Sequence, residues 1–535
     1  MIFSLLLSVA LTFDVCSAIS TPETQLLRLG GQGINLWKLR QQHKNTVRLD
    51  MGAQTILNDL TQKTALKNKY PELYFQQPLD HFDQTAGFTF GQRYYVDDRF
   101  YKPGGPVIVL DGGETSAEDR LPFMDHGILA ILSEATGGLS VILEHRYYGQ
   151  SVPVANFSTD SLRWLTNEQA LEDSARFMRN FKYDPIDEDL SAMFTPWIYY
   201  GGSYAGARAA HMRKWYPHLV FGGIASSAVT HAAIDYSDYY DVIRQTANQT
   251  CIGHIVSAIK SIDSILDIPL LSRPLKALFG LSGLEHDDDF VSLLAEVLGS
   301  VQATNWDPSV SSSSWDDFCE AINAGGAGMK LGFMRVPAEV MNYAAWVKKN
   351  IVSYCPEDST AEECFGTYDD VKYQDESDIG AWRAWTFQVC TQWGYFMPAP
   401  ADPEQPRIVS KRLTLEYTSK HCKQSFLPGK HFKIPPWPKV DEVNRLGDFG
   451  LTMNRLAFID GSNDPWKAAT PHSSLAPERI DTIDQPFKLI RGGVHHWDEN
   501  GLEDPSKEPN YIRRIHAEEV QFVEEWLNYY YPTSS

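Results

Sequence analysis

Ser203 is the residue whose surroundings most favour covalent chemistry. It stands in the glycine-flanked turn 201–206, which follows the apolar run 197–200 and precedes a helical pattern at 207–215. A strand, a tight turn and a helix in this order are typical of a nucleophile elbow, which lifts a serine hydroxyl above the end of a sheet. The strict G-x-S-x-G pattern is not met, because Ala205 stands two residues after the serine. An ordinary glycine-rich turn is therefore the alternative.

A serine hydroxyl is a weak nucleophile and needs a base, which in turn needs a carboxylate to orient it. In α/β-hydrolases the order is serine, acid, histidine, with the last two on loops after late strands. Asp464 follows the apolar run 456–459, and His495 follows the run 487–490. Each alone has a plainer interpretation, since aspartate before proline is common in turns and a histidine pair can lie on a surface loop. Together they predict a catalytic triad, although the residues alone do not separate His495 from His496.

The negative charge that develops on a substrate oxygen requires backbone N–H donors, which form an oxyanion hole. The amide of Tyr204, directly after the serine, is the first expected donor. The second is expected on the loop after the apolar run 107–110, where glycines allow the backbone to approach a substrate closely. We choose Gly113, and Gly112 and Glu114 remain alternatives on the same loop.

The elements that position these residues follow the pattern of a parallel sheet covered by helices. Short apolar runs, typical of strands buried on both faces, occur at 107–110, 141–143, 197–200, 223–225, 456–459 and 487–490. A helix with Thr166 at its N-cap lies between two of these runs, and an amphipathic helix closes the chain. An opening β-hairpin is expected over 74–95. Strands that alternate with helices in this way predict an α/β fold.

The middle of the chain, 235–430, differs from its surroundings. It holds the six cysteines that follow residue 18, many tryptophans and apolar residues at helical spacing. An even number of cysteines in an exported chain predicts disulfides, here three bonds that allow 15 pairings. We therefore expect a mostly helical, disulfide-bonded cap that is inserted between the nucleophile and the acid and covers the site.

The N-terminal stretch is apolar and ends in small residues, which predicts a secretory signal peptide over 1–18. We therefore expect a secreted, vacuolar or lysosomal protein, with N-glycans at the sequons of Asn156 and Asn248. Residues 19–70 carry eight Lys/Arg and three Asp/Glu, although the whole chain has a net charge of −21. This basic extension is either a pro-segment docked by charge or part of the fold. The acidic balance excludes nucleic acid and an anionic membrane as expected partners.

Several segments together resemble the family of lysosomal Pro-X carboxypeptidase and dipeptidyl peptidase II, serine peptidases that also include acid prolyl endopeptidases. The resemblance covers most of 74–525 and is carried by residues 79–82, 92–94, 144–149, 165–171, 201–204, 464–466 and 492–496. It implies an α/β-hydrolase domain with a helical cap, with Ser203 as nucleophile, Asp464 as acid and His495 as base. It also implies peptide substrates, a proline pocket walled by Trp466, and no cofactor or metal.

Two residues depart from the family pattern and remove charges expected near the site. Gln392 stands where relatives usually carry Glu, and Asn500 stands where several relatives carry Arg. The triad assignment is unaffected, but whether the enzyme recognises the N-terminal or the C-terminal end of the peptide is left open.

The sequence therefore predicts a serine peptidase that cleaves after proline through an acyl-enzyme, as a dipeptidyl peptidase or a Pro-X carboxypeptidase. The alternatives are a prolyl endopeptidase, an esterase or lipase of the same fold, and a non-catalytic binding protein. The oligomeric state is left open, with a homodimer among the alternatives. The expected organisation is a signal peptide, an N-terminal extension, a hydrolase domain in two parts and the cap, over 1–18, 19–70, 71–234 with 431–535, and 235–430.

Overall fold

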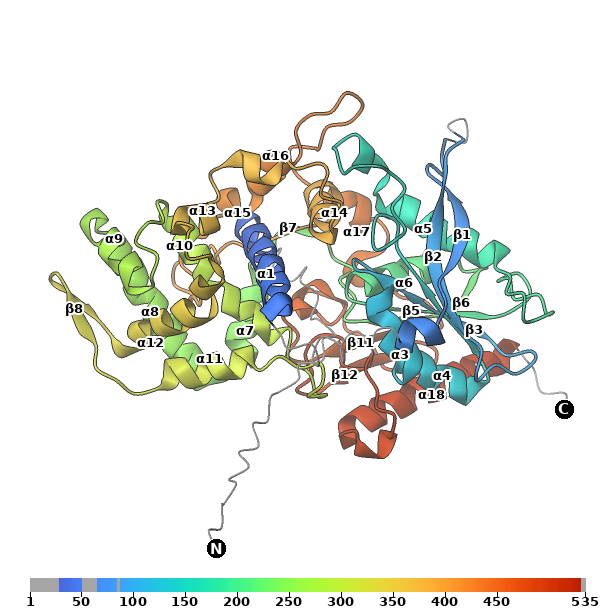
Figure 1. Ribbon diagram of the computed structural model, residues 1–535. Coiled ribbons are helices and arrows are strands. Elements are labelled where there is room, and N and C mark those ends of the chain that lie inside the picture. The colour runs from blue at the N-terminus through green and yellow to red at the C-terminus, as the bar shows by residue number, and fades with distance from the viewer. Residues whose placement is uncertain (1–27, 51–64, 84–86, 531–535) are drawn as a thin grey trace, which may run out of the picture.

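The computed structural model describes residues 28–50, 65–83 and 87–530, and the expected signal peptide lies outside this part of the chain. In Figure 1 the sheet and the helices packed against it lie on the right, and the helical cap lies on the left. Within the described residues the main sheet has eight strands in the order β1-β2-β4-β3-β5-β6-β11-β12. Their bounds are β1 Leu73–Pro78, β2 Thr89–Asp97, β3 Val107–Asp111, β4 Leu139–Leu143, β5 Trp197–Gly202, β6 Val220–Ser226, β11 Leu456–Gly461 and β12 Phe487–Ile490.

The sheet is antiparallel at one edge and parallel elsewhere. The hairpin β1–β2 and the pair β2–β4 are antiparallel, and all later pairs are parallel. All six expected strands are present, and the fold is that of an α/β-hydrolase. The carboxyl ends of parallel strands meet at one edge of a sheet, so the loops after β3, β5, β11 and β12 lie together.

Side chains of successive strand residues point to opposite faces, which accounts for the two helical layers. Ile108 and Leu110 of β3 pack with one group of helices, and Val107 and Val109 pack with another. The first layer contains α3 Leu121–Asp125, α4 Ile128–Thr136 and α18 Asn510–Tyr530. The second layer contains α5 Asn167–Asn180 and α6 Tyr204–Trp215. Both faces are thus covered, and continuous apolar runs are what such strands require.

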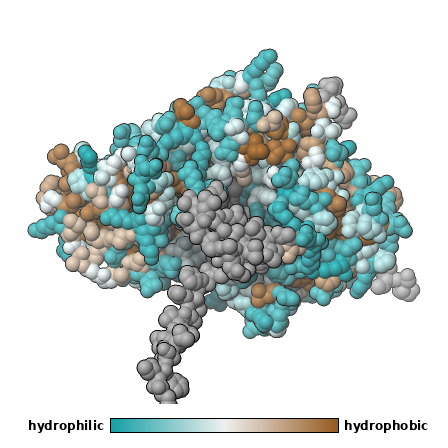
Figure 2. Space-filling model, in the orientation of Figure 1, coloured by the Kyte–Doolittle hydropathy of each residue, from teal (hydrophilic) through white to brown (hydrophobic). Residues whose placement is uncertain are grey.

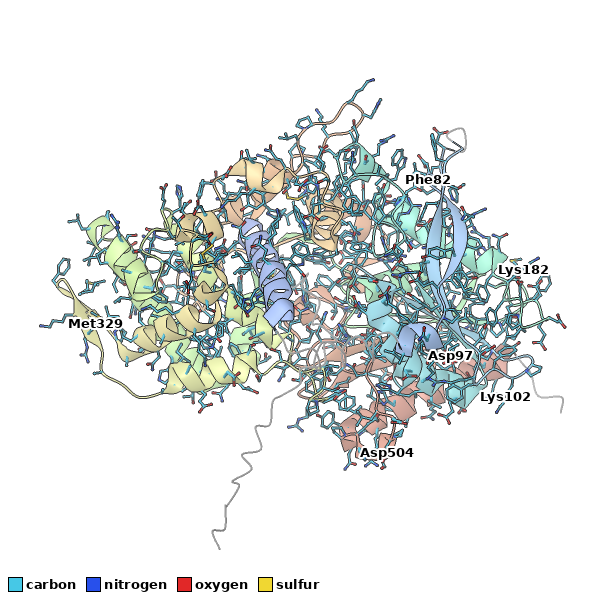
Figure 3. All side chains as sticks on the ribbon, in the orientation of Figure 1. Phe82, Asp97, Lys102, Lys182, Met329 and Asp504 are labelled. Atoms are coloured by element: carbon cyan, nitrogen blue, oxygen red, sulfur yellow. A yellow bond between two sulfur atoms is a disulfide. The ribbon has the colours of Figure 1, made fainter. Side chains whose placement is uncertain are left out.

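The cap lies between β6 and β11 in the sequence. Its long helices share one buried apolar cluster, which also includes Tyr204 and has Trp466 packed against it. Its helices are α7 Asp238–Thr246, α8 Gln249–Leu266, α9 Pro269–Leu278, α10 Asp287–Leu294, α11 Ser314–Asn323, α12 Ala338–Asn350, α13 Ala361–Phe365, α14 Ala381–Gln388, α15 Leu415–Ser419 and α16 His421–Ser425. The short helix α17 Val440–Asn444 follows, and short two-stranded sheets pair β7 Ala233–Asp235 with β10 Gly394–Phe396 and β8 Met329–Leu331 with β9 Met334–Val336. Met329 marks the outer end of the cap (Figure 3).

The six cysteines form three disulfides within the cap, and the structure selects one of the 15 pairings. The bonds join Cys251 to Cys319, Cys355 to Cys364 and Cys390 to Cys422. The first ties α8 to α11, and the last ties the π-helical turn Val389–Trp393, which follows α14, to α16. These bonds constrain the cap itself, whereas the sheet has no disulfide among its described residues.

The described part of the basic extension contains helix α1 Gly31–Asp50, which lies against the cap (Figure 1). Leu29, Leu36 and Leu39 join the apolar cluster of the cap, and Arg40 forms an ion pair with Glu296 at 2.6 Å. Both apolar packing and charge therefore hold this segment. The face drawn in Figure 2 is mostly hydrophilic. In the part of the chain described, no helix has the length and apolar character required to span a membrane.

Candidate active site

Ser203 occupies the turn between β5 and α6 with φ of 60°, a left-handed conformation that is rare outside glycine. The turn requires glycine at two positions, because the backbone there lies too close to other backbone atoms to leave room for a side chain. A Cβ on Gly201 would lie 2.1 Å from Ala205 O, and one on Gly206 would lie 2.5 Å from Ser226 O. Ala205, by contrast, has room for its methyl group. The essential glycines therefore stand at 201 and 206, and the departure from G-x-S-x-G at 205 has no steric cost.

Ser203, His495 and Asp464 form one hydrogen-bonded chain. His495 Nε2 lies 2.8 Å from Ser203 Oγ, and His495 Nδ1 lies 2.8 Å from Asp464 Oδ2. Asp464 is fully buried, and its Oδ1 accepts the N–H of Trp466 at 2.9 Å. Burial alone would raise the pKa of Asp464, but His495 and that amide hold it below its ordinary value. An ionised Asp464 places the proton of His495 on Nδ1 and leaves Nε2 free to accept the serine proton.

His496 lies beside this chain and contacts a different carboxylate. Its ring centroid is 4.5 Å from that of His495, and its Nδ1 lies 2.9 Å from Glu499 Oε2. Burial alone would lower the pKa of His496, but Glu499 raises it above its ordinary value. The geometry thus gives the two histidines different partners, a distinction that the residue pattern alone did not contain.

The amide groups around Ser203 are not equally available. Tyr204 begins α6, so its N–H belongs to the unsatisfied first turn of a helix. On the loop after β3, Gly112 N–H donates to Leu143 O at 2.8 Å, and Gly113 N–H donates to Asp111 Oδ1 at 3.0 Å. Gly113, the donor chosen from the sequence, therefore has its amide engaged. The amide of Glu114 donates to no other described residue, but it faces the carboxyl group of its own side chain and lowers the pKa of that group.

The ring of Tyr204 anchors α6 to the cap. Its hydroxyl lies 3.0 Å from His145 Nε2 and accepts a hydrogen bond from Gln388 Nε2 of α14 at 2.7 Å. The Nδ1 of His145 faces Arg146 O at 2.7 Å, so Nε2 is the acceptor for Tyr204. Burial lowers the pKa of His145 to about 3, so this ring is neutral and serves as a structural acceptor.

A cavity of about 40 Å³ opens onto Ser203 beneath the cap. Its wall includes the residues Glu114, Arg120, Val229, Gln302, Trp385, Tyr395, Trp466 and His496. Trp466 stacks on Tyr236 with ring centroids 5.1 Å apart and donates its indole N–H to Gln302 Oε1 at 2.8 Å. A rigid aromatic wall of this kind suits a small apolar ring. Trp466 was predicted here, and Glu114 and His496 were alternatives for the oxyanion donor and the base. The other wall residues were not predicted, because they are scattered along the sequence.

Gln392 lies outside this cavity and joins the cap to α5. Its Oε1 accepts the N–H of Asn167 at 2.8 Å, and its Nε2 lies 3.1 Å from Glu168 and from Glu442. A glutamate at 392 would bring three carboxylates together, so the neutral amide fits these neighbours. Asn500, the other departure, is buried.

The two sequons lie at exposed positions. In the described hydrogen bonds Asn156 and Asn248 both use Oδ1, the latter to cap α8. The Nδ2 atoms that would carry glycans take part in none of these bonds, so glycosylation at both sites remains a prediction.

Residues 77–513 match the model of the family described as serine carboxypeptidase S28. The chain belongs to this family of serine peptidases. A relative described as "Probable extracellular serine carboxypeptidase" from Arthroderma benhamiae is 40% identical over 86% of this chain and 68% of its own length. "Thymus-specific serine protease" of Homo sapiens is 27% identical over 85% of this chain and 86% of its own. Among solved structures, proline iminopeptidase from Mycobacterium smegmatis is 12% identical and covers 85% of this chain and 98% of its own, with a TM-score of 0.36.

Proposed function

We propose that this S28 peptidase hydrolyses peptide bonds after proline through an acyl-enzyme, acting as an exopeptidase. Ser203 attacks the carbonyl carbon of the proline residue while His495 accepts the serine proton on Nε2. Asp464 orients the ring and stabilises the imidazolium. The imidazolium then donates its proton to the departing amine, and the acyl-enzyme is hydrolysed by water with His495 again as base.

The observation that carries the proposal is the hydrogen-bonded chain of Ser203, His495 and Asp464 at the mouth of an aromatic-walled cavity. We infer that the amides of Tyr204 and Glu114 hold the oxyanion. Those of Gly112 and Gly113 donate to Leu143 O and Asp111 Oδ1, whereas the Glu114 amide interacts only with the carboxyl group of its own side chain among the described residues. One such donor contributes about 3 kcal/mol to transition-state stabilisation.

We infer that Trp466 faces the proline ring of the substrate. An indole presents a flat apolar surface to a pyrrolidine ring, and the stack on Tyr236 holds it in one orientation. Secretion or delivery to an acidic compartment is supported by the extracellular relative and by the net charge of −21.

A fluorophosphonate probe followed by peptide turnover tests the proposal. We expect the probe to label Ser203, and Ser203→Ala to lose both labelling and turnover. Labelled enzyme that cleaves esters but no post-proline peptide would favour the esterase alternative, and absence of labelling would refute a catalytic Ser203. Turnover of peptides blocked at both ends would favour an endopeptidase.

A further inference from the structure

Strand β6 supplies no residue of the triad, yet two serines at its end are bonded to the segments around it. β6 lies between β5, which precedes the nucleophile, and β11, which precedes the acid. Ser226 O accepts the N–H of Ser203 at 2.9 Å, and Ser227 N–H donates to Ile459 O of β11 at 2.7 Å. The Ser226 hydroxyl donates to Asp498 Oδ1 at 2.5 Å, on the loop after β12. The two serines therefore contact all three segments that carry triad residues.

The side chain of Ser227 is fully buried and forms two hydrogen bonds beside the triad. Its Oγ accepts the N–H of His496, the residue directly after the proposed base, at 2.8 Å. Because Oγ is the acceptor in that bond, the hydroxyl proton is free to be donated. Ser227 donates it to Asp464 and lowers the pKa of that carboxyl group. One hydroxyl group thus joins the acid to the loop of the base.

The backbone of Ser227 is in a conformation that does not favour serine. Its φ of 44° lies in the left-handed region, as does the φ of 36° at His496. Glycine adopts this region without strain, whereas a residue with a Cβ does so at a cost in free energy. Glycine would therefore suit the backbone at position 227, and what serine adds there is the hydroxyl group.

An ionised carboxylate that is fully buried, as Asp464 is, needs several hydrogen-bond donors. The Trp466 N–H and the ring of His495 are two of its donors. We propose that Ser227 is a positioning residue, whose hydroxyl group holds the Asp464 carboxylate in place against His495 and fixes the loop of the base. This inference rests on the proposed function and adds a residue that acts on catalysis through Asp464.

Another buried aspartate–histidine pair has the same arrangement and supplies a matched control. Thr470 Oγ1 accepts the N–H of His472 at 3.1 Å and donates to Asp460 Oδ2 at 2.5 Å. Asp460 in turn faces the ring of His472, and Thr470 is fully buried. None of these three residues lines the cavity at Ser203. Thr470→Ala therefore removes an equivalent hydroxyl group from a pair outside the site.

Ser227→Gly tests the proposal, because glycine suits the φ at this position and lacks the hydroxyl group. We expect kcat for a proline peptide to fall about 10–100-fold, as loss of a hydrogen bond to a charged group does. KM should stay nearly unchanged, since Ser227 does not line the cavity. The rate of fluorophosphonate labelling should fall with kcat. Ser227→Cys keeps a weak donor and should retain part of kcat, whereas Thr470→Ala should lower the melting temperature and leave kcat nearly unchanged.

A double-mutant cycle with Asp464→Asn separates an action through Asp464 from a general loosening of the site. Asparagine has no carboxylate to hold, so Ser227→Gly should have little further effect on the labelling rate in that background.

Wild-type kcat in Ser227→Gly would overturn the proposal, as would an undiminished effect of this change in the Asp464→Asn background or an equal loss of kcat in Thr470→Ala. If Ser227→Gly does not fold, Ser227→Cys keeps the size of the side chain and completes the same cycle. Absence of labelling at Ser203 in the wild type would instead refute the proposed function.

Discussion

Replacement of Asp464 by asparagine should abolish most turnover without disturbing the packing around it. The Trp466 N–H donates to Oδ1 at 2.9 Å, so an asparagine keeps its carbonyl oxygen at that amide. Its NH₂ group then faces His495 Nδ1, which lies 2.8 Å from Oδ2. The imidazole must accept there and carry its proton on Nε2, which points at Ser203 and can no longer act as base. The corresponding change in serine hydrolases lowers kcat about 10⁴-fold, or ~5.5 kcal/mol of activation free energy.

A second buried aspartate–histidine pair nearby provides a matched control. Asp460 Oδ2 lies 2.7 Å from His472 Nδ1, and both side chains are buried. Asp460→Asn should lower the melting temperature and leave kcat nearly unchanged, because His472 does not reach Ser203. Turnover of a chromogenic proline substrate and the rate of fluorophosphonate labelling measure both variants. A loss of only a few-fold in Asp464→Asn, or an equal loss in Asp460→Asn, would refute the assigned role of Asp464.

Three further changes separate catalysis, binding and stability. His495→Ala should remove turnover of esters and peptides alike, whereas His496→Ala should retain much of the turnover and the fluorophosphonate labelling; equal loss of labelling in both would contradict this. Trp466→Ala should lower kcat/KM for proline peptides by about 10–100-fold, measured against labelling of the same sample, because the wall of the proline pocket is lost. Burial raises the pKa of Glu519 well above its ordinary value, and neither of its carboxylate oxygens has a hydrogen-bond partner among the described residues. The folded state therefore binds the Glu519 proton more tightly than the unfolded state. The contribution of the protonated group to the free energy of unfolding is complete below about pH 4.3 and is lost as pH rises through the raised pKa. Glu519→Gln should stabilise the fold by about 1–3 kcal/mol at pH 7 and little at pH 4, measured by calorimetry, and a stabilisation equal at both pH values would contradict this.

Much of the sheet could be predicted because strands buried on both faces read as continuous apolar runs. The predicted segment 223–225 was too short, since β6 extends over Val220–Ser226. Gly222 interrupts the apolar pattern there, and its lack of a side chain is required because a Cβ would lie 2.7 Å from Trp526. The contact partner of that glycine lies some 300 residues away along the chain, so no local pattern could reveal it.

The neighbourhood of the candidate site could be predicted only where a residue follows a strand end. Ser203, Asp464 and His495 do so, and parallel strands bring their loops to one edge. Gln302 and Tyr395, by contrast, reach the cavity through the folding of the cap. The choice between Gly113 and Glu114 as donor depends on the side chain of Asp111, whose acceptor role is a tertiary feature. The cysteine pairing likewise could not be predicted from the sequence, since the choice among the 15 pairings depends on the positions of the helices in space.

The contacts of Tyr204 imply that the cap does more than cover the cleft. The amide of Tyr204 lies at the N-terminus of α6, where we propose that it holds the oxyanion. Its ring packs edge-on against Trp393 and Trp385 of the cap, with centroids 4.9 and 5.4 Å away, and its hydroxyl is bound by Gln388. A shift of α14 would therefore move the residue that supplies the amide. Because electrostatic stabilisation requires donors fixed in advance, docking of the cap and stabilisation of the oxyanion depend on the same side chain.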